Sequence, residues 1–340
     1  SLLRQHIVSS LGELSKTSSS KPWETPCIEN IASDDFPKKI TLTRANMLYI
    51  PLGGLSAKCV NLFKRMATFR NPEFYEKQGM RLSTYNIPRV ISCSELYDNY
   101  LALPRGCEDA VSNLLTQHGV QITISDKTNH GQSIDVSFKG ELREEQQSAI
   151  EAMLEHNIGT LSATTAFGKT VFAIAMIAKR KVNTLILVHN KALLEQWKER
   201  LDDFLEIQNT IDAPIGKIGR KRQDTIIGCL HSGKNTLRRI VDIALIQSSL
   251  KAGNVKAFVK DYGMVIVDEC HHVSSVSFEQ VLRQVNATFI YGLTATPIRK
   301  DGRQPIIFMQ CGQIRFSSSS KDQIAKQTFK RTLIPRFTTY

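Results

Sequence analysis

Hydrophobic residues after Gly140 gather in short unbroken runs, and segments with the spacing of helices separate these runs. The runs are rich in β-branched residues, which is typical of strands buried on both faces of a parallel sheet. Strands and helices that alternate in this way predict a doubly wound α/β domain. The predicted strands are Thr160–Ala163, Thr184–Val188, Asp242–Leu245, Met264–Val267 and Phe289–Leu293.

The pattern before Gly140 is mixed and predicts a small α+β domain over residues 34–138. Val120–Ser125 and Ile134–Phe138 alternate apolar and polar residues around the turn Asn129–Gly131, so we expect them to pair as a hairpin. The other elements expected here are helices over Ser56–Phe69 and Glu108–His118 and strands over Ile40–Leu42 and Pro88–Cys93.

These patterns divide the chain into parts. Residues 1–33 are expected to be a linker with a short helix, because Ser15–Ser20 is rich in Ser, Lys and Thr and prolines follow it. The small domain covers residues 34–138, and the doubly wound domain covers residues 139–315.

The composition is that of a globular protein, with 340 residues, 41% hydrophobic and 22% charged, enough for two domains. No apolar run is long enough to span a membrane, and the first residues do not resemble a signal peptide. The seven cysteines form no CxxC pair, which favours reduced thiols and a cytoplasmic location. The net charge of +12 fits a nucleic-acid partner, with a solvated basic surface as the alternative.

The segment Ala163–Thr170 lies between a predicted strand and a predicted helix, as a phosphate-binding loop requires. Small residues let backbone N–H groups turn toward phosphates, and the helix N-terminus adds partial positive charge. Lys169 can reach the β- and γ-phosphates of ATP, and the Thr170 hydroxyl can ligate Mg²⁺. Ala163 replaces the usual first glycine, so an ordinary strand–turn–helix junction is the alternative. The expected nucleotide-binding residues are Thr164, Thr165, Ala166, Phe167, Gly168, Lys169 and Thr170.

A second motif, Asp-Glu-Cys-His-His over Asp268–His272, follows a predicted strand directly. Asp268 can hold Mg²⁺ directly or through water, and Glu269 can orient and deprotonate the attacking water. A metal site at the paired histidines is disfavoured, because adjacent side chains diverge and no third ligand is near. We expect His271 or His272 to contact neighbouring loops or to couple the nucleotide state to the rest of the protein.

A third motif, Gly292–Pro297 (Gly-Leu-Thr-Ala-Thr-Pro), also follows a predicted strand. Thr294 and Thr296 can hydrogen-bond to the Asp-Glu segment and so transmit loss of the γ-phosphate, although a plain Thr-rich turn is the alternative. All three motifs stand at the C-terminal ends of their strands, where ligands of open α/β sheets bind. We therefore expect one nucleotide site with Lys169, Asp268 and Glu269 as its catalytic residues.

With these motifs the chain resembles superfamily 2 helicases of the DEAD/DEAH type, and within them the XPB-like and type III restriction-subunit-like branch. The resemblance implies a first RecA-like lobe with the P-loop NTPase fold and a mostly parallel sheet, which uses ATP and Mg²⁺. Leu142–Gln146 (Leu-Arg-Glu-Glu-Gln) looks like the adenine-reading segment of that branch. This likeness implies that Gln146 recognises the base, with Arg143 nearby.

Further segments of this domain resemble motifs that face the nucleic acid in the family. Val188–Lys191 with Leu194–Trp197 looks like a motif that touches the nucleic-acid backbone, and Ile246–Leu250 looks like a strand-end motif on the same surface. The resemblance implies nucleic-acid contacts from Lys191 and Gln247. The continuation Arg299–Gly302 (Arg-Lys-Asp-Gly) is also similar to XPB-like proteins.

The resemblance covers about Asp35 to Arg315 and so includes the small domain. That region resembles helicases of bacterial TOTE conflict systems, in which the helicase is joined to nuclease or primase-type modules. XPB-like motors have a small DNA-contacting domain at a comparable position, which implies that residues 34–138 contact nucleic acid. The segments that resemble TOTE helicases are Ala67–Tyr75, Pro88–Ile91 and Leu103–Cys107.

The chain departs from the family at its end. Superfamily 2 motors need a second RecA-like lobe, and an arginine finger of the kind it supplies can be worth about 10³–10⁵ in rate. The residues after Pro297 are too few to form that lobe. We therefore expect residues 316–340 to be a connector toward a second lobe of the same chain, and expect this chain to hydrolyse ATP poorly by itself.

Basic residues give further candidates for nucleic-acid contact. Lys217–Arg222 and Lys234–Arg239 are dense basic stretches around an expected strand at Thr225–Leu230, and within the first we single out Lys217 and Arg220. Exposed basic loops are the alternative. In the small domain Arg105, in a Pro-Arg-Gly turn, is the preferred contact. The other arginines that could form a basic face there are Arg65, Arg70, Arg81 and Arg89.

The sequence therefore predicts an ATP-dependent helicase or double-strand translocase that acts on nucleic acid, with DNA favoured over RNA. One alternative is the motor subunit of a restriction- or conflict-system assembly with separate nuclease or primase modules. Another is a nucleic-acid-binding module with weak ATPase activity, which the intact Lys169, Asp268 and Glu269 disfavour.

Overall fold

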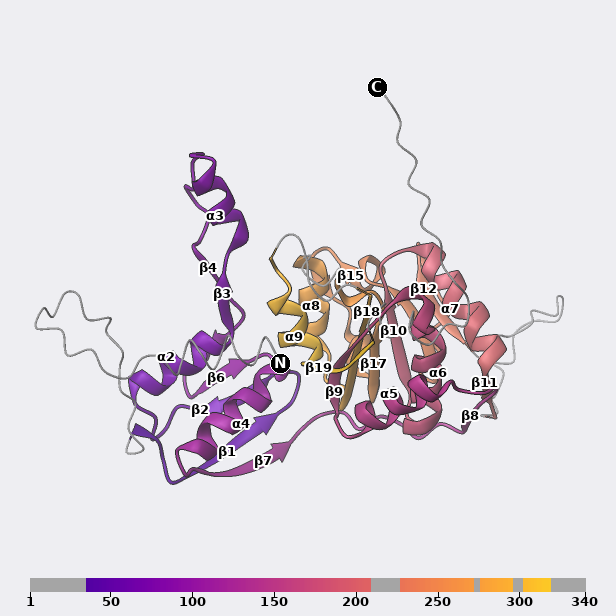
Figure 1. Ribbon diagram of the computed structural model, residues 1–340, viewed down its shortest axis with the longest axis horizontal. Coiled ribbons are helices and arrows are strands. Elements are labelled where there is room, and N and C mark those ends of the chain that lie inside the picture. Colours follow the sequence, from indigo (N-terminus) through magenta and orange to yellow (C-terminus); the bar gives the residue numbers. More distant parts are fainter. Residues whose placement is uncertain (1–34, 209–226, 272–275, 296–301, 319–340) are drawn as a thin grey trace, which may run out of the picture.

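The computed structural model describes residues 35–208, 227–271, 276–295 and 302–318, which fold into two bodies side by side (Figure 1). The larger body, called the lobe here, has an eight-stranded sheet of order β13-β12-β14-β10-β17-β18-β9-β19. Its neighbours are parallel except at β13, which confirms the predicted mostly parallel sheet. The strands are β9 (Ile158–Ala163), β10 (Thr184–Val188), β12 (Gly228–His231), β13 (Lys234–Asn235), β14 (Val241–Leu245), β17 (Met264–Val267), β18 (Phe289–Thr294) and β19 (Ile314–Ser318).

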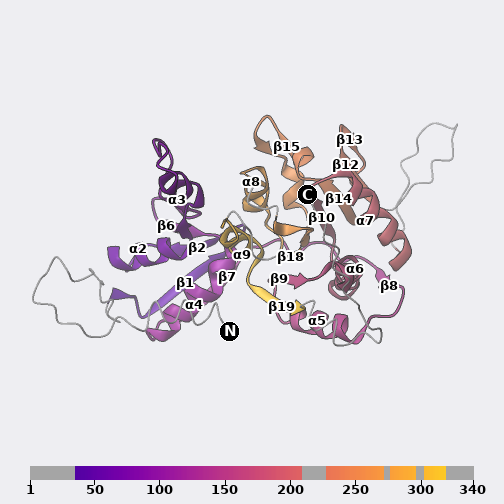
Figure 2. The same ribbon diagram turned by 45° about the horizontal axis from the view of Figure 1, so that its top comes forward.

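Helices cover both faces of this sheet (Figures 1 and 2). Leu185 and Leu187 of β10 pack into one hydrophobic cluster, and the alternate residues Ile186 and Val188 pack into the other. Burial on both faces explains why the strands have unbroken hydrophobic sequences. The helices on one face are α5 (Glu144–Leu154), α6 (Lys169–Arg180) and α7 (Lys191–Phe204), and those on the other are α8 (Val276–Gln284) and α9 (Pro305–Cys311).

The small domain has a five-stranded sheet of order β5-β6-β2-β1-β7. Ser56 caps the first of its two packed helices by accepting a hydrogen bond from the Cys59 amide at 3.3 Å. Its buried residues, such as Leu42 and Phe63, belong to the same hydrophobic cluster as α8 and α9 of the lobe. The elements are β1 (Lys39–Arg44), β2 (Leu48–Pro51), α2 (Ala57–Met66), β5 (Glu95–Leu96), β6 (Tyr100–Leu103), α4 (Glu108–Gln117) and β7 (Gln121–Asp126).

The strands of the expected hairpin exist, but the pairing prediction is wrong. β7 pairs in parallel with β1, whereas β8 (Val136–Phe138) pairs antiparallel with β11 (Leu205–Ile207) of the lobe. The chain between β7 and β8 crosses to the lobe, where the Asn129 amide donates to Asn286 O at 2.6 Å. The alternation identified the strands, but their partners are distant in sequence.

Residues 316–318 also differ from the prediction, which placed them in a connector. Residues 316–318 belong to β19, which pairs in parallel with β9 and therefore extends the sheet. Ser318 hydrogen-bonds Glu145 at the start of α5. The expected connector thus cannot begin at residue 316, and the remainder of it lies outside the described residues.

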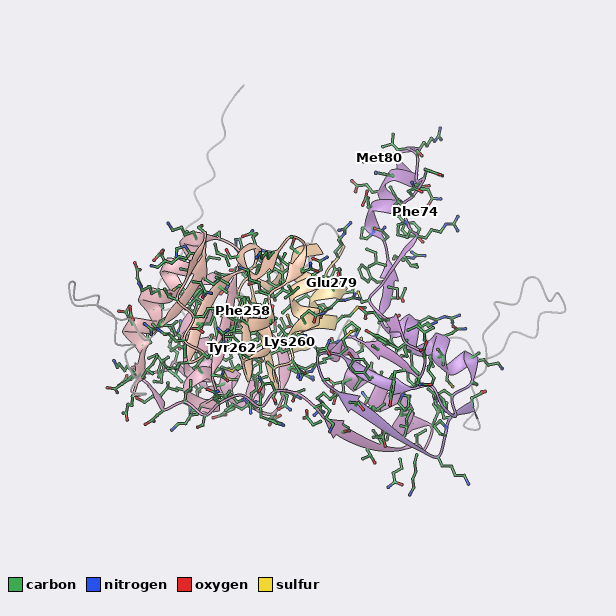
Figure 3. All side chains as sticks on the ribbon, turned by 180° about the vertical axis from the view of Figure 1, so that it is seen from behind. Phe74, Met80, Phe258, Lys260, Tyr262 and Glu279 are labelled. Carbon is green, nitrogen blue, oxygen red and sulfur yellow. The ribbon has the colours of Figure 1, made fainter. Side chains whose placement is uncertain are left out.

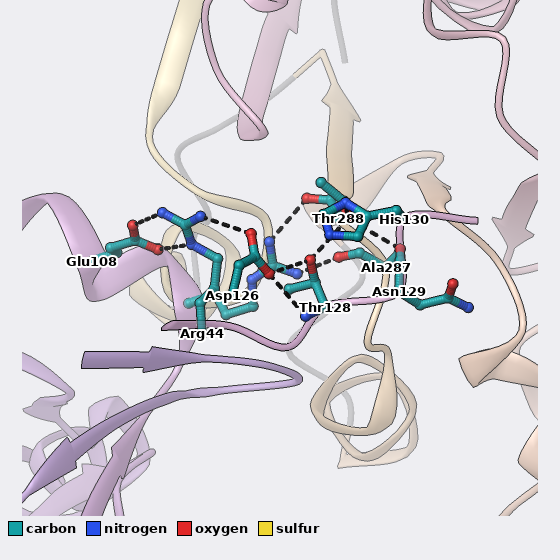
Figure 4. Close-up of polar contacts among 9 residues, drawn as sticks. Arg44, Glu108, Asp126, Thr128, Asn129, His130, Ala287 and Thr288 are labelled. Atoms are coloured by element: carbon teal, nitrogen blue, oxygen red, sulfur yellow. Dashed lines mark hydrogen bonds and ion pairs between the residues drawn. The ribbon is translucent and has the colours of Figure 1, made fainter. Parts of the chain in front are cut away.

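A polar network joins the small domain to the lobe (Figure 4). Arg44 pairs with Glu108 and, at 3.1 Å, with Asp126. Asp126 accepts a hydrogen bond of 2.7 Å from the Thr128 hydroxyl, which lies 2.8 Å from the Thr288 hydroxyl. Burial would raise the pKa of Asp126, but the hydrogen bonds from Thr128 and Arg44 outweigh it and hold this pKa below its ordinary value. The network ends directly before β18, the strand that carries Thr294.

Arg105 lies in this interface, so the prediction that it contacts nucleic acid is wrong. Its side chain is 2% exposed, and its guanidinium donates to the backbone oxygens of Ala287 and, at 2.9 Å, Thr288. Burial lowers the pKa of Arg105 to about 10. A Cβ on Gly106 would stand 1.9 Å from Phe308 O of α9. The Pro-Arg-Gly turn therefore anchors the two domains to each other.

A narrow arm rises from the small domain (Figures 1 and 2). Its stalk is the antiparallel pair β3 (Thr68–Arg70) and β4 (Val90–Ser92), and beyond the stalk lies α3 (Pro72–Gly79). We use the name arm for residues 68–92. The sequence predicted β4, but it did not predict α3 or the projection.

Six cysteines within the described ranges, Cys59 to Cys311, are free and buried. In the same part of the chain no helix is long and apolar enough to cross a membrane. The cytoplasmic location stays a prediction.

Candidate functional site

The candidate site lies at the C-terminal edge of the parallel sheet. β9, β10, β14, β17 and β18 run in the same direction, so the segments that follow them meet at one edge. β18 lies between β17 and β9. The three sequence motifs with candidate chemistry are therefore carried by adjacent strands, at the place where such sheets bind ligands.

The loop after β9 has the shape of a phosphate-binding loop. Thr165–Phe167 forms a short 3-10 turn, and Gly168 follows with φ of 80°, in the left-handed region. A Cβ at Gly168 would lie 2.9 Å from Gln146 Nε2. Both the left-handed φ and this close approach therefore favour glycine at the position. Helix α6 starts at Lys169, and its N-terminus therefore faces the loop.

Lys169 points back over the loop that precedes it. Its side chain is buried, and Nζ donates to Ala163 O at 3.2 Å. The same Nζ lies 3.8 Å from Glu269 Oε1. The structure thus brings together Lys169 and the carboxylate predicted to activate water.

Asp268 is a buried carboxylate at the end of β17. Oδ2 accepts a hydrogen bond of 2.7 Å from Trp197 Nε1, and Oδ1 accepts one of 2.9 Å from the Glu269 amide. Desolvation raises the pKa of Asp268, and the bond from Trp197 opposes this rise. The carboxylate therefore depends on its hydrogen-bond donors to stay charged.

The backbone at Glu269 is strained. Its φ is 46°, a left-handed conformation that costs a non-glycine residue about 1–3 kcal/mol. In this conformation Glu269 Oε1 lies 3.8 Å from Lys169 Nζ, and Oε2 lies 3.1 Å from His271 Nδ1. Strain of this kind is common where a side chain must be aimed at a reacting group.

Sequence reasoning missed the role of Trp197. The segment Leu194–Trp197 was interpreted as part of a nucleic-acid-facing motif, yet Trp197 is 1% exposed and bonds to Asp268. One signal was present in the sequence. A tryptophan on the apolar face of a helix needs an acceptor for its indole N–H once it is buried, and Asp268 follows a buried strand.

Gln146 and Arg143 lie against the phosphate loop. Gln146 Nε2 donates to Phe167 O at 2.8 Å, and its Oε1 accepts from the Arg143 amide at 3.0 Å. The Arg143 guanidinium donates to Phe167 O and, at 3.2 Å, to Ala166 O. The predicted adenine-reading pair thus stands directly beside the loop, and its recognition of the base stays a proposal.

A hydrogen-bond link runs from the third motif to the second. Thr294 is fully buried, and its hydroxyl lies 3.2 Å from His271 Nδ1. The two other residues predicted to couple the motifs, Thr296 and His272, lie outside the described residues. In the part of the chain that the structure describes, His271 Nδ1 thus lies close to both Thr294 Oγ1, at 3.2 Å, and Glu269 Oε2, at 3.1 Å.

The oxygen donors at this edge fit a magnesium ion held together with a nucleotide. Asp268 offers a buried carboxylate, and Thr170, half-buried in the first turn of α6, offers a hydroxyl. Both are hard oxygen ligands of the kind that Mg²⁺ prefers. When bound, Mg²⁺ would neutralise charge on the β- and γ-phosphates.

The candidate nucleic-acid residues of the lobe lie near the same edge. Lys191 is exposed at the start of α7, and Gln247 is exposed after β14, with Nε2 3.4 Å from His189 O. Lys191 also lines a surface pocket of ≈ 270 Å³ together with Lys198, His231 and Lys234. Lys217 and Arg220 lie outside the described residues.

The fold and these residues define the class of P-loop nucleoside triphosphatases with a carboxylate pair of the Asp-Glu-x-His type. Comparisons with known proteins narrow the class. Residues 139–299 match the family model described as type III restriction enzyme, res subunit. The lobe therefore resembles the ATP-binding lobe of superfamily 2 helicases, in particular those of the XPB-like and type III restriction-subunit-like branch.

Individual relatives agree with this assignment. The chain is 28% identical over 195 residues to the DNA 3'-5' translocase XPB2 of Sulfurisphaera tokodaii, an alignment that covers 57% of this chain and 40% of the relative. It is 28% identical over 197 residues to the DNA 3'-5' helicase XPB of Kineococcus radiotolerans, covering 56% and 32% respectively. The chain thus spans less than half the length of both relatives.

A solved structure extends the likeness of the fold beyond the lobe. The UvsW helicase of bacteriophage T4 superposes with a TM-score of 0.57 at 16% identity, covering 82% of this chain and 99% of that one. At this identity the likeness concerns the fold alone. The resemblance to TOTE helicases stays a prediction.

Proposed function

We propose that the protein is an ATP-dependent nucleic-acid motor, a helicase or double-strand translocase that acts on DNA. The observation that carries the proposal is the group of Lys169, Asp268 and Glu269 at one sheet edge, with Nζ of Lys169 3.8 Å from Glu269. Nucleotide hydrolysis needs a cation for the phosphates, a carboxylate for the metal and a base for water, and these three residues supply them.

In this proposal each residue has a separate task. Lys169 and the amides of the loop bind the β- and γ-phosphates of ATP, while Glu269 accepts the proton of the attacking water. Thr170 and Asp268 hold Mg²⁺, and Gln146 with Arg143 contacts adenine. Loss of the γ-phosphate changes the surroundings of Glu269. Contacts through His271 pass that change to Thr294, at the end of β18.

Nucleic acid is proposed to lie across the start of α7 at Lys191 and the turn that begins at Gln247, with the small domain beside it. A second RecA-like lobe of the same chain would complete the ATP site, and nuclease or primase modules are further candidate partners. DNA is favoured because XPB relatives are named as DNA translocases and helicases.

Movement on DNA is the test of this proposal. The full-length protein is expected to displace a triplex-forming strand from duplex DNA in the presence of ATP and Mg²⁺, and Glu269→Gln is expected to bind ATP but not to displace the strand. A duplex RNA substrate serves as the comparison. Stimulation of ATP hydrolysis by RNA but not by DNA would reassign the substrate, and displacement by Glu269→Gln would contradict the proposal.

A further inference from the structure

The arm of residues 68–92 is a built structure rather than a loose loop. Asn71 is 4% exposed and ties its two sides together, since Nδ2 donates to Pro88 O at 2.8 Å and the amide donates to Arg89 O at 2.9 Å. Phe74 is buried beneath the Arg89 guanidinium, 5.5 Å from the ring centroid. Figure 3 shows Phe74 and Met80 on the arm, which projects from the small domain.

The tip of the arm exposes large apolar side chains. Met80 is 61% exposed, Leu82 57% and Tyr85 84%. Exposed apolar side chains gathered on one projection fit a surface that another molecule covers. Two residues at the tip, Arg81 and Asn86, have left-handed φ angles of 56° and 63°, so the chain bends sharply there.

Charge indicates what that molecule is. The basic residues of the arm are Arg70, Lys77, Arg81 and Arg89, and its acidic residues are Glu73 and Glu76. Glu73 is already paired with Lys77 at 3.1 Å and with Arg303 at 3.4 Å. Exposed aromatic and apolar side chains among arginines fit nucleic-acid bases and phosphates, since bases stack on such side chains while arginines neutralise the backbone.

The base of the arm is tied to helix α8 and to residues 302–303 of the lobe. Arg283 of α8 donates to Glu95 Oε1 at 2.8 Å and to Cys93 O at 2.9 Å, just after the arm ends. Arg303 contacts Glu73, and a Cβ on Gly302 would stand 3.0 Å from Pro72. Helix α8 follows the Asp268–Glu269 motif and residues 302–303 follow the Thr294 motif. Contacts from two segments of the lobe therefore hold the base of the arm.

We propose that the tip of the arm is a nucleic-acid site that inserts Leu82 and Tyr85 between bases where duplex DNA meets single strands. Arg81 contacts a phosphate beside them. The proposal deepens the proposed function and rests on it, because only a motor that moves along DNA would use the insertion to part the strands. The alternative occupant of the tip is a protein surface, such as a second lobe.

The test compares Leu82→Ala/Tyr85→Ala with a matched control, Leu96→Ala/Tyr100→Ala. The control removes the same residue types from exposed positions on β5 and β6, where Leu96 is 59% and Tyr100 43% exposed. All four side chains are on the surface, so both variants should fold, which their melting temperatures verify. The probe is forked DNA with 2-aminopurine at the junction, titrated without ATP.

The wild-type chain is expected to raise the 2-aminopurine fluorescence, because an unstacked base fluoresces more strongly. The arm variant should lose this rise and bind the fork about tenfold or more weakly, whereas the control variant should behave like the wild type. Arg81→Ala should weaken binding and reduce its salt dependence while leaving the fluorescence rise at saturation.

Three outcomes would overturn the inference. The first is an unchanged fluorescence rise and affinity in the arm variant, and the second is no fork binding by the wild type. In the third outcome, the arm variant responds to the fork as the wild type does, but cross-linking shows that its tip no longer contacts another part of the full-length protein. That result would assign the tip to a protein surface. Failure of the motor proposal is a separate result, since it shows as ATP hydrolysis that is insensitive to DNA.

Discussion

Trp197→Phe tests how the buried carboxylate at the end of β17 is kept ready for a metal. The substitution removes the indole N–H that donates to Asp268 Oδ2 at 2.7 Å, and it keeps an aromatic ring in a site that is 1% exposed. Because desolvation raises the pKa of Asp268, the loss of a donor makes the charged form less favourable. We expect the variant to bind Mg²⁺ and ATP together more weakly than the wild type.

The size of the effect follows from the charge of the acceptor. A hydrogen bond to a charged group contributes about 1.5–3 kcal/mol. At about 1.4 kcal/mol for each factor of ten, the apparent affinity for Mg²⁺ should fall by roughly tenfold to a hundredfold. Removal of partners that orient a metal ligand typically costs about the same factor.

The direction in which pH affects Mg²⁺ binding follows from the raised pKa of Asp268. A carboxyl group whose pKa is raised in the folded protein destabilises the fold above that pKa, and this penalty disappears as the pH falls toward the ordinary value of 3.8. Loss of the Trp197 donor raises the pKa of Asp268 further. The acid limb of Mg²⁺ binding should therefore move to higher pH in Trp197→Phe.

The assay is a titration of Mg²⁺ against the chain with a fluorescent ATP analogue, repeated over a series of pH values. Leu201→Val is the matched control, because Leu201 lies on the same helix, is fully buried and does not bond to Asp268. Binding of the analogue without Mg²⁺ should be nearly equal in all three proteins. If Trp197→Phe and Leu201→Val show the same Mg²⁺ affinity and the same acid limb, the reasoning is refuted.

Three further predictions follow from individual contacts. Arg105→Met leaves the backbone oxygens of Ala287 and Thr288 without this donor and should lower the free energy of unfolding in urea by about 2–5 kcal/mol. The salt dependence of DNA binding should stay as in the wild type. A weaker salt dependence in the variant would restore Arg105 as a phosphate contact. Gln146→Ala should reduce the preference for ATP over GTP by roughly tenfold in competition binding, and an equal loss for both nucleotides would limit Gln146 to supporting the loop. Thr294→Val removes the hydroxyl beside His271 and should preserve nucleotide affinity while reducing DNA-stimulated ATP hydrolysis by the full-length protein, so an equal fall in basal and stimulated rates would argue against coupling.

The sequence predicted the parts of the fold that carry a local signal. The five central strands of the lobe's eight-stranded sheet were predicted because burial on both faces leaves an unbroken hydrophobic run, as in β10, Thr184–Val188. The loop before Lys169 and the carboxylates after β17 were found because each follows such a strand. Their meeting at one edge follows from the parallel order of the sheet.

Features that depend on distant partners could not be predicted. The partner of β8 is β11, and nothing in either short segment indicates the other. Arg105 looked like a surface arginine because the interface that buries it is made by residues 287–288 and α9, which are remote in the sequence. Trp197 was placed in a nucleic-acid-facing motif, but its indole is buried against Asp268, an acceptor that is set by how α7 packs on the sheet.

The central claim is that Lys169, Asp268 and Glu269 form an ATP site that serves a nucleic-acid motor. ATP hydrolysis by the full-length protein, with and without duplex DNA, tests it most directly when the wild type is compared with Lys169→Ala. The account predicts stimulation by DNA in the wild type and a loss of about a hundredfold or more in the variant, with the fold intact by circular dichroism. Undiminished hydrolysis by Lys169→Ala would contradict it.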